Sequence, residues 1–175
     1  MPNYCGYVMR VKGEPQNVDR FISLLKADYD EPKHFWRIFD AEVFNEECTD
    51  GMKIADISGD CAWSVHSCMR DGFGTYADKN PESSTTLEEQ SELLQLAIEV
   101  YGSEPGIGFQ EHYLYKNGEE IINDCEDYSE MYFEDEADFE SEKEQGYCDG
   151  LSWDEVDENG YIKTGGIEDW GIFEI

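Results

Sequence analysis

The sequence predicts an α+β protein whose elements follow the order strand, helix, strands, helix, strands. Three observations support this class: an alternating apolar pattern at the start, two segments with helical apolar spacing, and glycine turns between the other apolar runs. This order is that of a ferredoxin-like βαββαβ sheet with its helices on one face. An acidic C-terminal helix and a β-hairpin are expected to follow the sheet.

The first strand and the first helix are expected before residue 28. Cys5, Tyr7, Met9 and Val11 recur with a period of two, which predicts a strand with one buried face. Pro15 stands where the helix would begin, because a missing N–H is no loss at the first helical position. The helix then carries one apolar stripe, formed by Val18, Phe21, Ile22 and Leu25.

Strands and a second helix are expected next. Three strand candidates lie at residues 34–44, 52–58 and 61–69. Asp50-Gly51 marks a turn between the first two of them. Thr86 and Glu89 have the spacing of a capping box, so a helix is expected to begin there, and a further strand starts near Ile98.

Two hairpins are expected in the second half, one joining residues 109–115 to 119–124 and one joining 153–156 to 161–164. The first contains Asn117-Gly118, a favoured pair for a type I′ turn, and the second contains Asn159-Gly160. The chain ends on the apolar run GIFEI, which we expect to be docked on the protein. The division into domains is expected to be a ferredoxin-like domain at 1–122 and an acidic helix-plus-hairpin extension at 123–175, packed on it.

The composition bounds the class of protein. Of 175 residues, 39% are hydrophobic and 14% aromatic, which is too apolar for a fully disordered chain. No run of 18 apolar residues and no secretory signal is present, so we expect a cytoplasmic protein of the host cell without a membrane partner. The six cysteines include no CxxC pair and are expected to be buried or half-buried free thiols, with no metal and no cofactor.

The charge of the chain is uneven. Residues 1–118 hold 21 acidic and 10 basic residues, a net charge of −11, whereas residues 119–175 hold 21 acidic residues and only Lys143 and Lys163, a net charge of −19. Together they give the −30 of the whole chain. Such a field repels nucleic acid and attracts basic surfaces. The expected partner is therefore a basic nucleic-acid-binding protein, not nucleic acid itself.

Residues 126–144 carry ten acids in 19 positions. Tyr128, Tyr132 and Phe139 fall at helical spacing and can share one face with Met131, which predicts a helix with carboxylates on its other faces. At a rise of about 1.5 Å per residue, such a helix carries one negative charge per roughly 3 Å. A DNA strand carries one phosphate per about 3.4 Å. This density makes nucleic-acid mimicry a reasonable hypothesis.

Two blocks of the sequence resemble a known family. The start MPNYCGYVMRVKG and the block TLEEQSELLQLAIEVYGSEPGIGFQEHYLYKNGEEI, with the tryptophan-containing CAWSV between them, look like the YubB ferredoxin-like family. The resemblance covers about residues 1–122 and implies a ferredoxin-like fold in a gene carried on plasmids or phages. The acidic extension after residue 122 matches nothing in that family.

The function expected from these observations is inhibition, by a phage or plasmid protein, of a host defence nuclease such as a CRISPR effector. Carboxylates would take the place of phosphates in its basic groove, where arginine pairs with them bidentately. The candidate partner-binding residues are Glu126, Asp127, Glu130, Glu134, Asp135, Glu136, Asp138, Glu140, Glu142 and Glu144, and, as a second group, Asp154, Glu155, Asp157 and Glu158. The alternatives are an acidic interaction module for another basic partner without mimicry, and a carboxylate-based hydrolase.

Catalytic and metal-binding patterns are weaker. His66 and Cys68 share a face of the expected strand at 61–69, but no third orienting group can be named, and His112 is isolated. Glu155, Asp157 and Asn159 resemble the start of an EF-hand loop, yet Gly166 stands where its bidentate glutamate belongs. The sequence therefore favours a protein that is not an enzyme, and its oligomeric state stays open.

Overall fold

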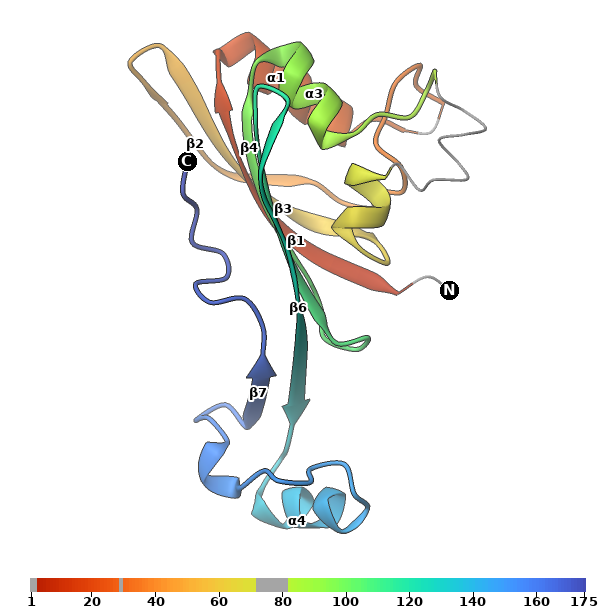
Figure 1. Ribbon diagram of the computed structural model, residues 1–175, viewed down its shortest axis with the longest axis vertical. Coiled ribbons are helices and arrows are strands. Elements are labelled where there is room, and N and C mark those ends of the chain that lie inside the picture. Colours follow the sequence, from red (N-terminus) through yellow and green to blue (C-terminus); the bar gives the residue numbers. More distant parts are fainter. Residues whose placement is uncertain (1–2, 29, 72–81) are drawn as a thin grey trace.

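The computed structural model describes residues 3–28, 30–71 and 82–175, and in this part of the chain one antiparallel sheet of seven strands dominates (Figure 1). The strands are β1 (Tyr4–Gly13), β2 (Glu42–Thr49), β3 (Met52–Ala62), β4 (Ala97–Glu104), β5 (Phe109–Lys116), β6 (Glu119–Tyr132) and β7 (Tyr161–Gly165). The helices are α1 (Pro15–Leu25), α3 (Leu87–Leu94) and α4 (Glu136–Glu144), with a π-helical turn η1 (His66–Arg70) and a 3₁₀ turn η2 (Trp153–Glu155).

The sheet has the strand order β2-β3-β1-β4-β5-β6-β7. This arrangement confirms the α+β class. It differs from a four-stranded βαββαβ sheet, because β5, β6 and β7 extend it beyond β4, each antiparallel to the strand before it. No helix in the described part of the chain is long and apolar enough to cross a membrane.

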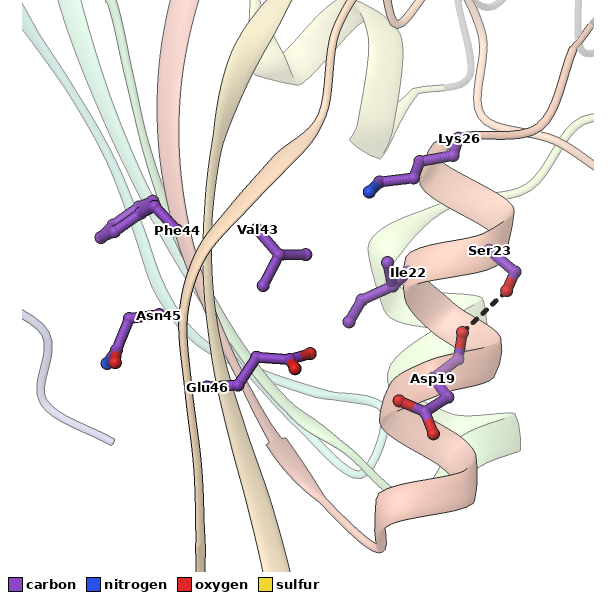
Figure 2. A pocket seen from close by; sticks show the side chains of 8 residues that line it. All are labelled: Asp19, Ile22, Ser23, Lys26, Val43, Phe44, Asn45 and Glu46. Atoms are coloured by element: carbon purple, nitrogen blue, oxygen red, sulfur yellow. Dashed lines mark hydrogen bonds between the residues drawn. The ribbon is translucent and has the colours of Figure 1, made fainter.

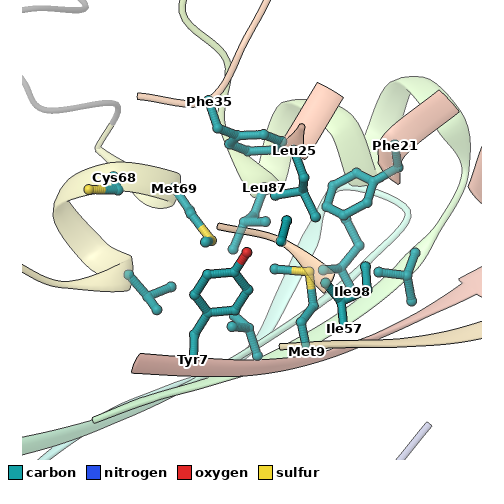
Figure 3. Close-up of a cluster of buried hydrophobic side chains, with 14 of the residues drawn as sticks. Tyr7, Met9, Phe21, Leu25, Phe35, Ile57, Cys68, Met69, Leu87 and Ile98 are labelled. Atoms are coloured by element: carbon teal, nitrogen blue, oxygen red, sulfur yellow. The ribbon is translucent and has the colours of Figure 1, made fainter. Parts of the chain in front are cut away.

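The main core lies between the helices α1 and α3 and one face of the sheet (Figure 3). The predicted face of β1 is confirmed, since Cys5, Tyr7, Met9 and Val11 are all buried. Pro15 is the first residue of α1, as predicted, and the helix stripe is buried at Val18, Phe21 and Leu25. Full burial of a side chain such as that of Phe21 contributes about 1.5–3 kcal/mol relative to leaving it exposed.

Two of the expected strands differ from the structure. In the range 34–44 only the last residues are in a strand, since β2 begins at Glu42. The strand expected at 61–69 is wrong, because β3 ends at Ala62 and a helical turn follows at residues 66–70. Trp63 has a positive φ of 64°, which redirects the chain, and the Ser64 hydroxyl then accepts a hydrogen bond from the Ser67 N–H at 2.9 Å.

The second helix and the strand after it are confirmed. The Thr86 hydroxyl accepts a hydrogen bond from the Glu89 N–H at 3.2 Å, which caps α3. The Glu89 carboxylate does not close the capping box; it accepts a hydrogen bond from the Thr85 hydroxyl at 2.6 Å. The strand expected near Ile98 is β4.

The hairpin between β5 and β6 is confirmed as well. Asn117 and Gly118 have φ values of 52° and 85°, as a type I′ turn requires, and the Asp50-Gly51 turn between β2 and β3 has the same pair of positive φ angles. A bulge at Ile121 then shifts the register, so that Leu114 pairs with Ile122 while Tyr115 pairs with Glu120.

The long acidic helix expected from residue 126 is wrong in its first half. β6 continues to Tyr132 because its last five residues pair with β7, from Tyr128 opposite Gly165 to Tyr132 opposite Tyr161. Met131 lies opposite Ile162 and packs on a second, smaller core. Pairing with a partner strand thus overrides the helical spacing of the tyrosines, and only α4 is helical.

The second expected hairpin is also wrong. Residues 153–155 form the 3₁₀ turn η2, in which the Glu155 carboxylate accepts a hydrogen bond from the Ser152 N–H at 2.7 Å. β7 pairs with β6 instead. The second core that results consists of Phe133, Phe139, Cys148 and Ile162, with Met131, Leu151, Trp153 and Val156 around it.

The last ten residues, 166–175, return over the sheet face that α1 and α3 leave open (Figure 1). The Tyr101 hydroxyl donates to the Ile172 carbonyl oxygen at 2.7 Å, and the Glu174 N–H donates to the Glu99 carboxylate at 2.7 Å. The expected docking of the apolar end is therefore confirmed. The division at residue 122 stays a prediction; β6 runs across it without interruption.

Candidate acidic interaction surface

The acidic residues of the C-terminal third are carried by a small, separately packed part of the molecule. We call residues 128–165 the acidic unit and the remaining described residues, up to 127 and from 166 to 175, the body. The acidic unit contains the second core and forms one end of the long axis, while α1 and α3 lie towards the other end (Figure 1). Its position leaves the surface of α4 and of the loops around it open to a partner.

The predicted acids lie mostly on the outside. Twelve of the fourteen are exposed, and Glu130 and Glu142 are half-buried. They are spread over four local structures: β6 (Glu126, Asp127, Glu130), the connection to α4 (Glu134, Asp135), α4 itself (Glu136, Asp138, Glu140, Glu142, Glu144), and η2 with the loop after it (Asp154, Glu155, Asp157, Glu158). The prediction of exposed acids is right, but they do not lie on one helix.

The helix α4 forms because its first turn is capped and its one buried residue is large. The Asp135 carboxylate accepts a hydrogen bond from the Asp138 N–H at 2.9 Å, and Asp138 in turn accepts one from the Glu134 N–H at 3.1 Å. Both carboxylates stand at the positive end of the helix dipole, which stabilises them there. Phe139 is fully buried against Phe133 and holds the helix on the second core.

The far end of α4 is less favourable. Glu142 and Glu144 stand in the last turn, at the negative end of the dipole, where a carboxylate destabilises a helix. Lys143 offsets part of this charge: its ammonium group donates to the Leu151 carbonyl oxygen at 2.9 Å and lies 5.3 Å from the centre of the Phe139 ring. Five acids in the nine residues of α4 give one carboxylate per about 2.7 Å of helix. The charge density of a DNA strand is thus reached on this helix.

The second group of acids lies on the turns between α4 and β7. The Asp157 carboxylate accepts hydrogen bonds from the N–H groups of Asn159 at 2.8 Å and Tyr161 at 3.0 Å. These backbone donors lower the pKa of Asp157, so it stays ionised. This Asx turn accounts for the EF-hand-like spacing. Among the described residues, no three His, Cys, Asp or Glu side chains are arranged to hold a metal ion.

The acids of β6 are divided between two faces. Glu126 and Asp127 are neighbours on a strand, so their side chains point to opposite sides of the sheet. Glu126 lines a cavity beneath residues 166–174, whereas Asp127 lines a shallow pocket near Gly108. Glu130 accepts a hydrogen bond from the Tyr128 hydroxyl at 2.8 Å. A single row of carboxylates from residue 126 to 144 is therefore not present.

Acids in the body have a different environment. An open pocket of about 550 Å³ lies between α1 and β2. Its side chains Ile22 and Val43 point towards each other (Figure 2). Its two carboxylates, Asp19 and Glu46, lie 2.7 and 2.6 Å from the ammonium group of Lys53. Lys26 also lines the pocket, so two lysines balance the two carboxylates and the pocket offers no acidic surface to a basic partner.

A buried polar cluster in the body was not found from the sequence. Glu111 is 2% exposed and accepts a hydrogen bond from the His66 N–H at 3.0 Å, and its burial raises its pKa to about 7. Arg70 donates to the Tyr115 hydroxyl at 2.6 Å and lies 4.3 Å from the centre of the Tyr113 ring. Residues 111, 113 and 115 alternate along β5 and so share one face. This spacing is the sequence signal that could have grouped Glu111 with Tyr113 and Tyr115.

The suggested pairing of His66 and Cys68 is wrong. Both residues lie in η1, where the Cys68 thiol donates to the Ala62 carbonyl oxygen at 2.8 Å and His66 Nδ1 is 3.3 Å from Arg70 Nη1. His112, in contrast, is not isolated: its Nε2 lies 2.9 Å from the Glu99 carboxylate. The cysteines are free thiols, four of them buried, while Cys48 and Cys125 are exposed.

Comparison of the chain with protein-family models, with curated proteins and with solved structures finds no match. The resemblance to the YubB family therefore stays a prediction.

Proposed function

We propose that this chain is a mobile-element inhibitor of a host defence nuclease, such as a CRISPR effector, and acts as an acidic nucleic-acid mimic in the basic groove of that enzyme. The observation that carries the proposal is the acidic unit: exposed carboxylates on a folded scaffold with its own core, and only Lys143 and Lys163 as bases. The proposal gives the chain no catalytic role and no cofactor.

Two features support mimicry over a surface that only promotes solubility. Like charges so close together oppose folding, and the chain nevertheless places five of them on a helix of nine residues. The Asp135 cap and the buried Phe139 fix this helix, so the backbone that carries its carboxylates is ordered before a partner arrives. A fixed array loses less conformational entropy on binding than a disordered acidic tail would.

The body supports a proposal about the fold. We propose that β1 to β4, with α1 and α3, form a ferredoxin-like unit that the later strands extend. The order β2-β3-β1-β4 and the position of the two helices in the connections β1–β2 and β3–β4 support it. In the proposed function this unit serves as a rigid platform for the acidic unit.

One observation favours a second candidate function. Because Glu126 and Asp127 face opposite sides of β6, the candidate carboxylates are divided between two faces and do not follow one line. Such a surface also suits a basic protein that does not bind nucleic acid. The second candidate is therefore an acidic interaction module without mimicry, and competition by DNA distinguishes the two.

The test is binding of the immobilised protein to Cas9-type effectors and restriction nucleases, with and without competing DNA, in a series of salt concentrations. Mimicry predicts that DNA excludes the protein and that affinity falls steeply with salt, because paired charges are screened. Binding that DNA leaves unchanged would support the second candidate. Absence of binding to every such enzyme would contradict the proposal.

Matched variants locate the surface. Glu136→Gln, Glu140→Gln and Glu144→Gln together remove three charges from α4, and Glu14→Gln, Glu42→Gln and Glu92→Gln together remove three exposed charges from the body. Each lost charge-assisted contact costs about 1.5–3 kcal/mol, so we expect the α4 variant to bind at least about tenfold more weakly. The body variant is expected to bind within about twofold of the unchanged protein at moderate salt. Equal weakening in both would mean that only net charge matters.

A further inference from the structure

A cavity of about 590 Å³ lies where residues 166–174 pass over β4, β5 and β6. Its walls combine aromatic rings and carboxylates: Tyr101, His112, Phe173, Asp124, Glu126, Glu168, Asp169 and Glu174. The volume is in the range of small-ligand sites. Gly166, with a φ of 91°, is what allows the chain to enter this path, since a Cβ there would stand 2.6 Å from the Gln110 side-chain oxygen.

Next to the lining residue His112 lies a buried glutamate with its hydrogen bonds satisfied. Glu99 is fully buried, and its carboxylate accepts hydrogen bonds from the N–H groups of Glu174 at 2.7 Å and Ile175 at 3.2 Å. His112 Nε2 lies 2.9 Å from the same carboxylate, which accepts only, so Nε2–H is the donor. This contact fixes the imidazole ring, which also stacks on Tyr101 with centroids 3.9 Å apart.

The other nitrogen of this ring points to a ligand. His112 is only 6% exposed, and its Nδ1 makes no hydrogen bond to the described residues. Among these residues, every fully buried side-chain nitrogen or oxygen atom has a hydrogen-bond partner. Nδ1 is therefore not sealed in the protein. Because His112 is a lining residue, we infer that Nδ1 opens onto the cavity. With Nε2 as the donor, the neutral ring offers Nδ1 as an acceptor for an N–H group.

The charges around the cavity select the ligand. Asp124, directly opposite His112 in the β5–β6 register, and Glu126 add carboxylates on one side, and Glu168 adds one from the covering segment. Among its lining residues that the structure describes, none is a lysine or an arginine. The nearby Arg10 is held by Asp56 at 2.7 and 2.9 Å and stacks on Phe173, so it does not neutralise these acids.

We propose that this cavity binds an aliphatic guanidinium group, the side chain of an arginine presented by the basic partner. A guanidinium has five N–H donors in a planar fork that pairs with carboxylates and stacks on aromatic faces. The acceptor Nδ1 and the carboxylates of Asp124 and Glu126 provide the polar contacts, and Tyr101 and Phe173 line the cavity beside them. The inference rests on the proposed function, because it names one group of the partner and adds a second contact site beside α4.

The test uses L-argininamide as the probe, titrated into the ¹⁵N-labelled full chain at low salt, with n-butylammonium as a comparison cation. We expect shifts of His112, Asp124 and the indole signal of Trp170, whose ring packs against that of Tyr101 at a centroid distance of 5.9 Å. Binding of n-butylammonium, which lacks the planar fork, is expected to be weaker. The variant pair Asp124→Asn and Glu126→Gln changes two exposed residues and is expected to weaken argininamide binding about tenfold. The control pair Glu14→Gln and Glu42→Gln removes the same charge from two exposed positions of the body and is expected to leave it within about twofold.

Equal weakening in both pairs, or shifts spread over α4, would overturn the inference and leave diffuse attraction of cations. The two proposals fail separately, because the probe needs no partner protein. If argininamide does not bind while nucleases do, only the arginine site is wrong. If argininamide binds while no basic protein does, the proposed function is wrong and the cavity is a site for a free guanidinium compound.

Discussion

The body and the acidic unit are stabilised in different ways. The body packs a large buried core and pairs acids with bases, as in Asp56 with Arg10 and Asp19 with Lys53. The acidic unit has four buried core residues, and its ion pair between Glu130 and Lys163 is 3.9 Å long. The chain thus concentrates its stability in the body and its uncompensated charge in the acidic unit. A partner that supplies positive charge would stabilise the acidic unit far more than the body.

The largest effect is expected from removing one phenylalanine from each core, which tests whether the two regions are stabilised separately. Phe139→Ala and Phe21→Ala each empty a fully buried site and are each expected to cost about 3–5 kcal/mol. In the acidic unit this exceeds what the remaining contacts can supply, so we expect α4 and β7 to lose protection while β1 to β4 keep it. Hydrogen exchange measured by mass spectrometry resolves the two regions. Phe21→Ala is expected to lower protection throughout, and uniform loss in both variants would show one cooperative unit.

The buried Glu111 gives the body a pH-dependent free energy of unfolding. Its folded-state pKa of about 7 lies above the unfolded value of 4.5, so the native state retains a proton that the unfolded chain has lost. The free energy of unfolding therefore falls as pH rises from about 4.5 to 7, by about 3 kcal/mol in total for this group. The body thus carries one unfavourable buried charge at high pH.

Glu111→Gln isolates this effect from the many exposed acids. The free energy of unfolding is measured by urea titration at pH 4.5, 6 and 8 for both proteins. Between pH 4.5 and pH 8 the variant is expected to gain about 3 kcal/mol of stability relative to the unchanged protein. Glu92→Gln, at an exposed position, serves as the control and is expected to change by less than about 0.5 kcal/mol. A pH-independent difference for Glu111→Gln would mean that Glu111 titrates normally.

Equivalent helix caps in the two regions give a smaller effect. Asp135 caps α4 and Thr86 caps α3 through the same contact to the N–H three residues on, and replacing either by alanine is expected to cost about 1 kcal/mol. In α3 the buried Leu87 and Leu94 keep the helix formed, whereas α4 has Phe139 alone. We expect Asp135→Ala to raise amide exchange along the whole of α4 and Thr86→Ala only in the first turn of α3. Equal fraying of both helices would argue against the difference in packing.

The two lysines of the acidic unit give the smallest pair of effects. Lys143→Gln loses a hydrogen bond to the Leu151 carbonyl oxygen and the contact with the Phe139 ring, which together are expected to destabilise the unit by about 1 kcal/mol. Lys163→Gln loses only an exposed pair with Glu130 and is expected to cost less than about 0.5 kcal/mol. Both variants remove one positive charge, so local exchange rates separate the specific contacts from the change in charge. Identical effects would assign the role of Lys143 to charge alone.

The body could be predicted from the sequence where a single face of an element is buried. The alternation in β1, the stripe of α1, the Thr86 cap and the Asn117-Gly118 turn all concern neighbours in the chain, and local geometry decides them. The strand expected at 61–69 failed because Val65, Cys68 and Met69 are buried on one side of a helical turn, and so short an apolar run does not distinguish a helical turn from a strand.

The acidic unit was harder to predict, for a physical reason. Tyr128 and Tyr132 have helical spacing, yet their conformation is set by β7, about 30 residues later in the chain. The exposure of the acids could be predicted from composition, but their division between two faces of β6 depends on that pairing. The contact of His112 with Glu99 joins two strands across a register that the sequence does not reveal.

The path of the chain at the junction has a consequence for how such a protein can change over time. The chain leaves the body at Asp127 and re-enters it at Gly166, and the Gly166 N–H donates to the Asp127 carbonyl oxygen at 2.8 Å. The acidic unit thus has the connectivity of a cassette whose two ends meet. In evolution, such a cassette can be lengthened, exchanged or lost without a change in the strand order of the body. The acidic unit can therefore diversify while the fold of the body is conserved.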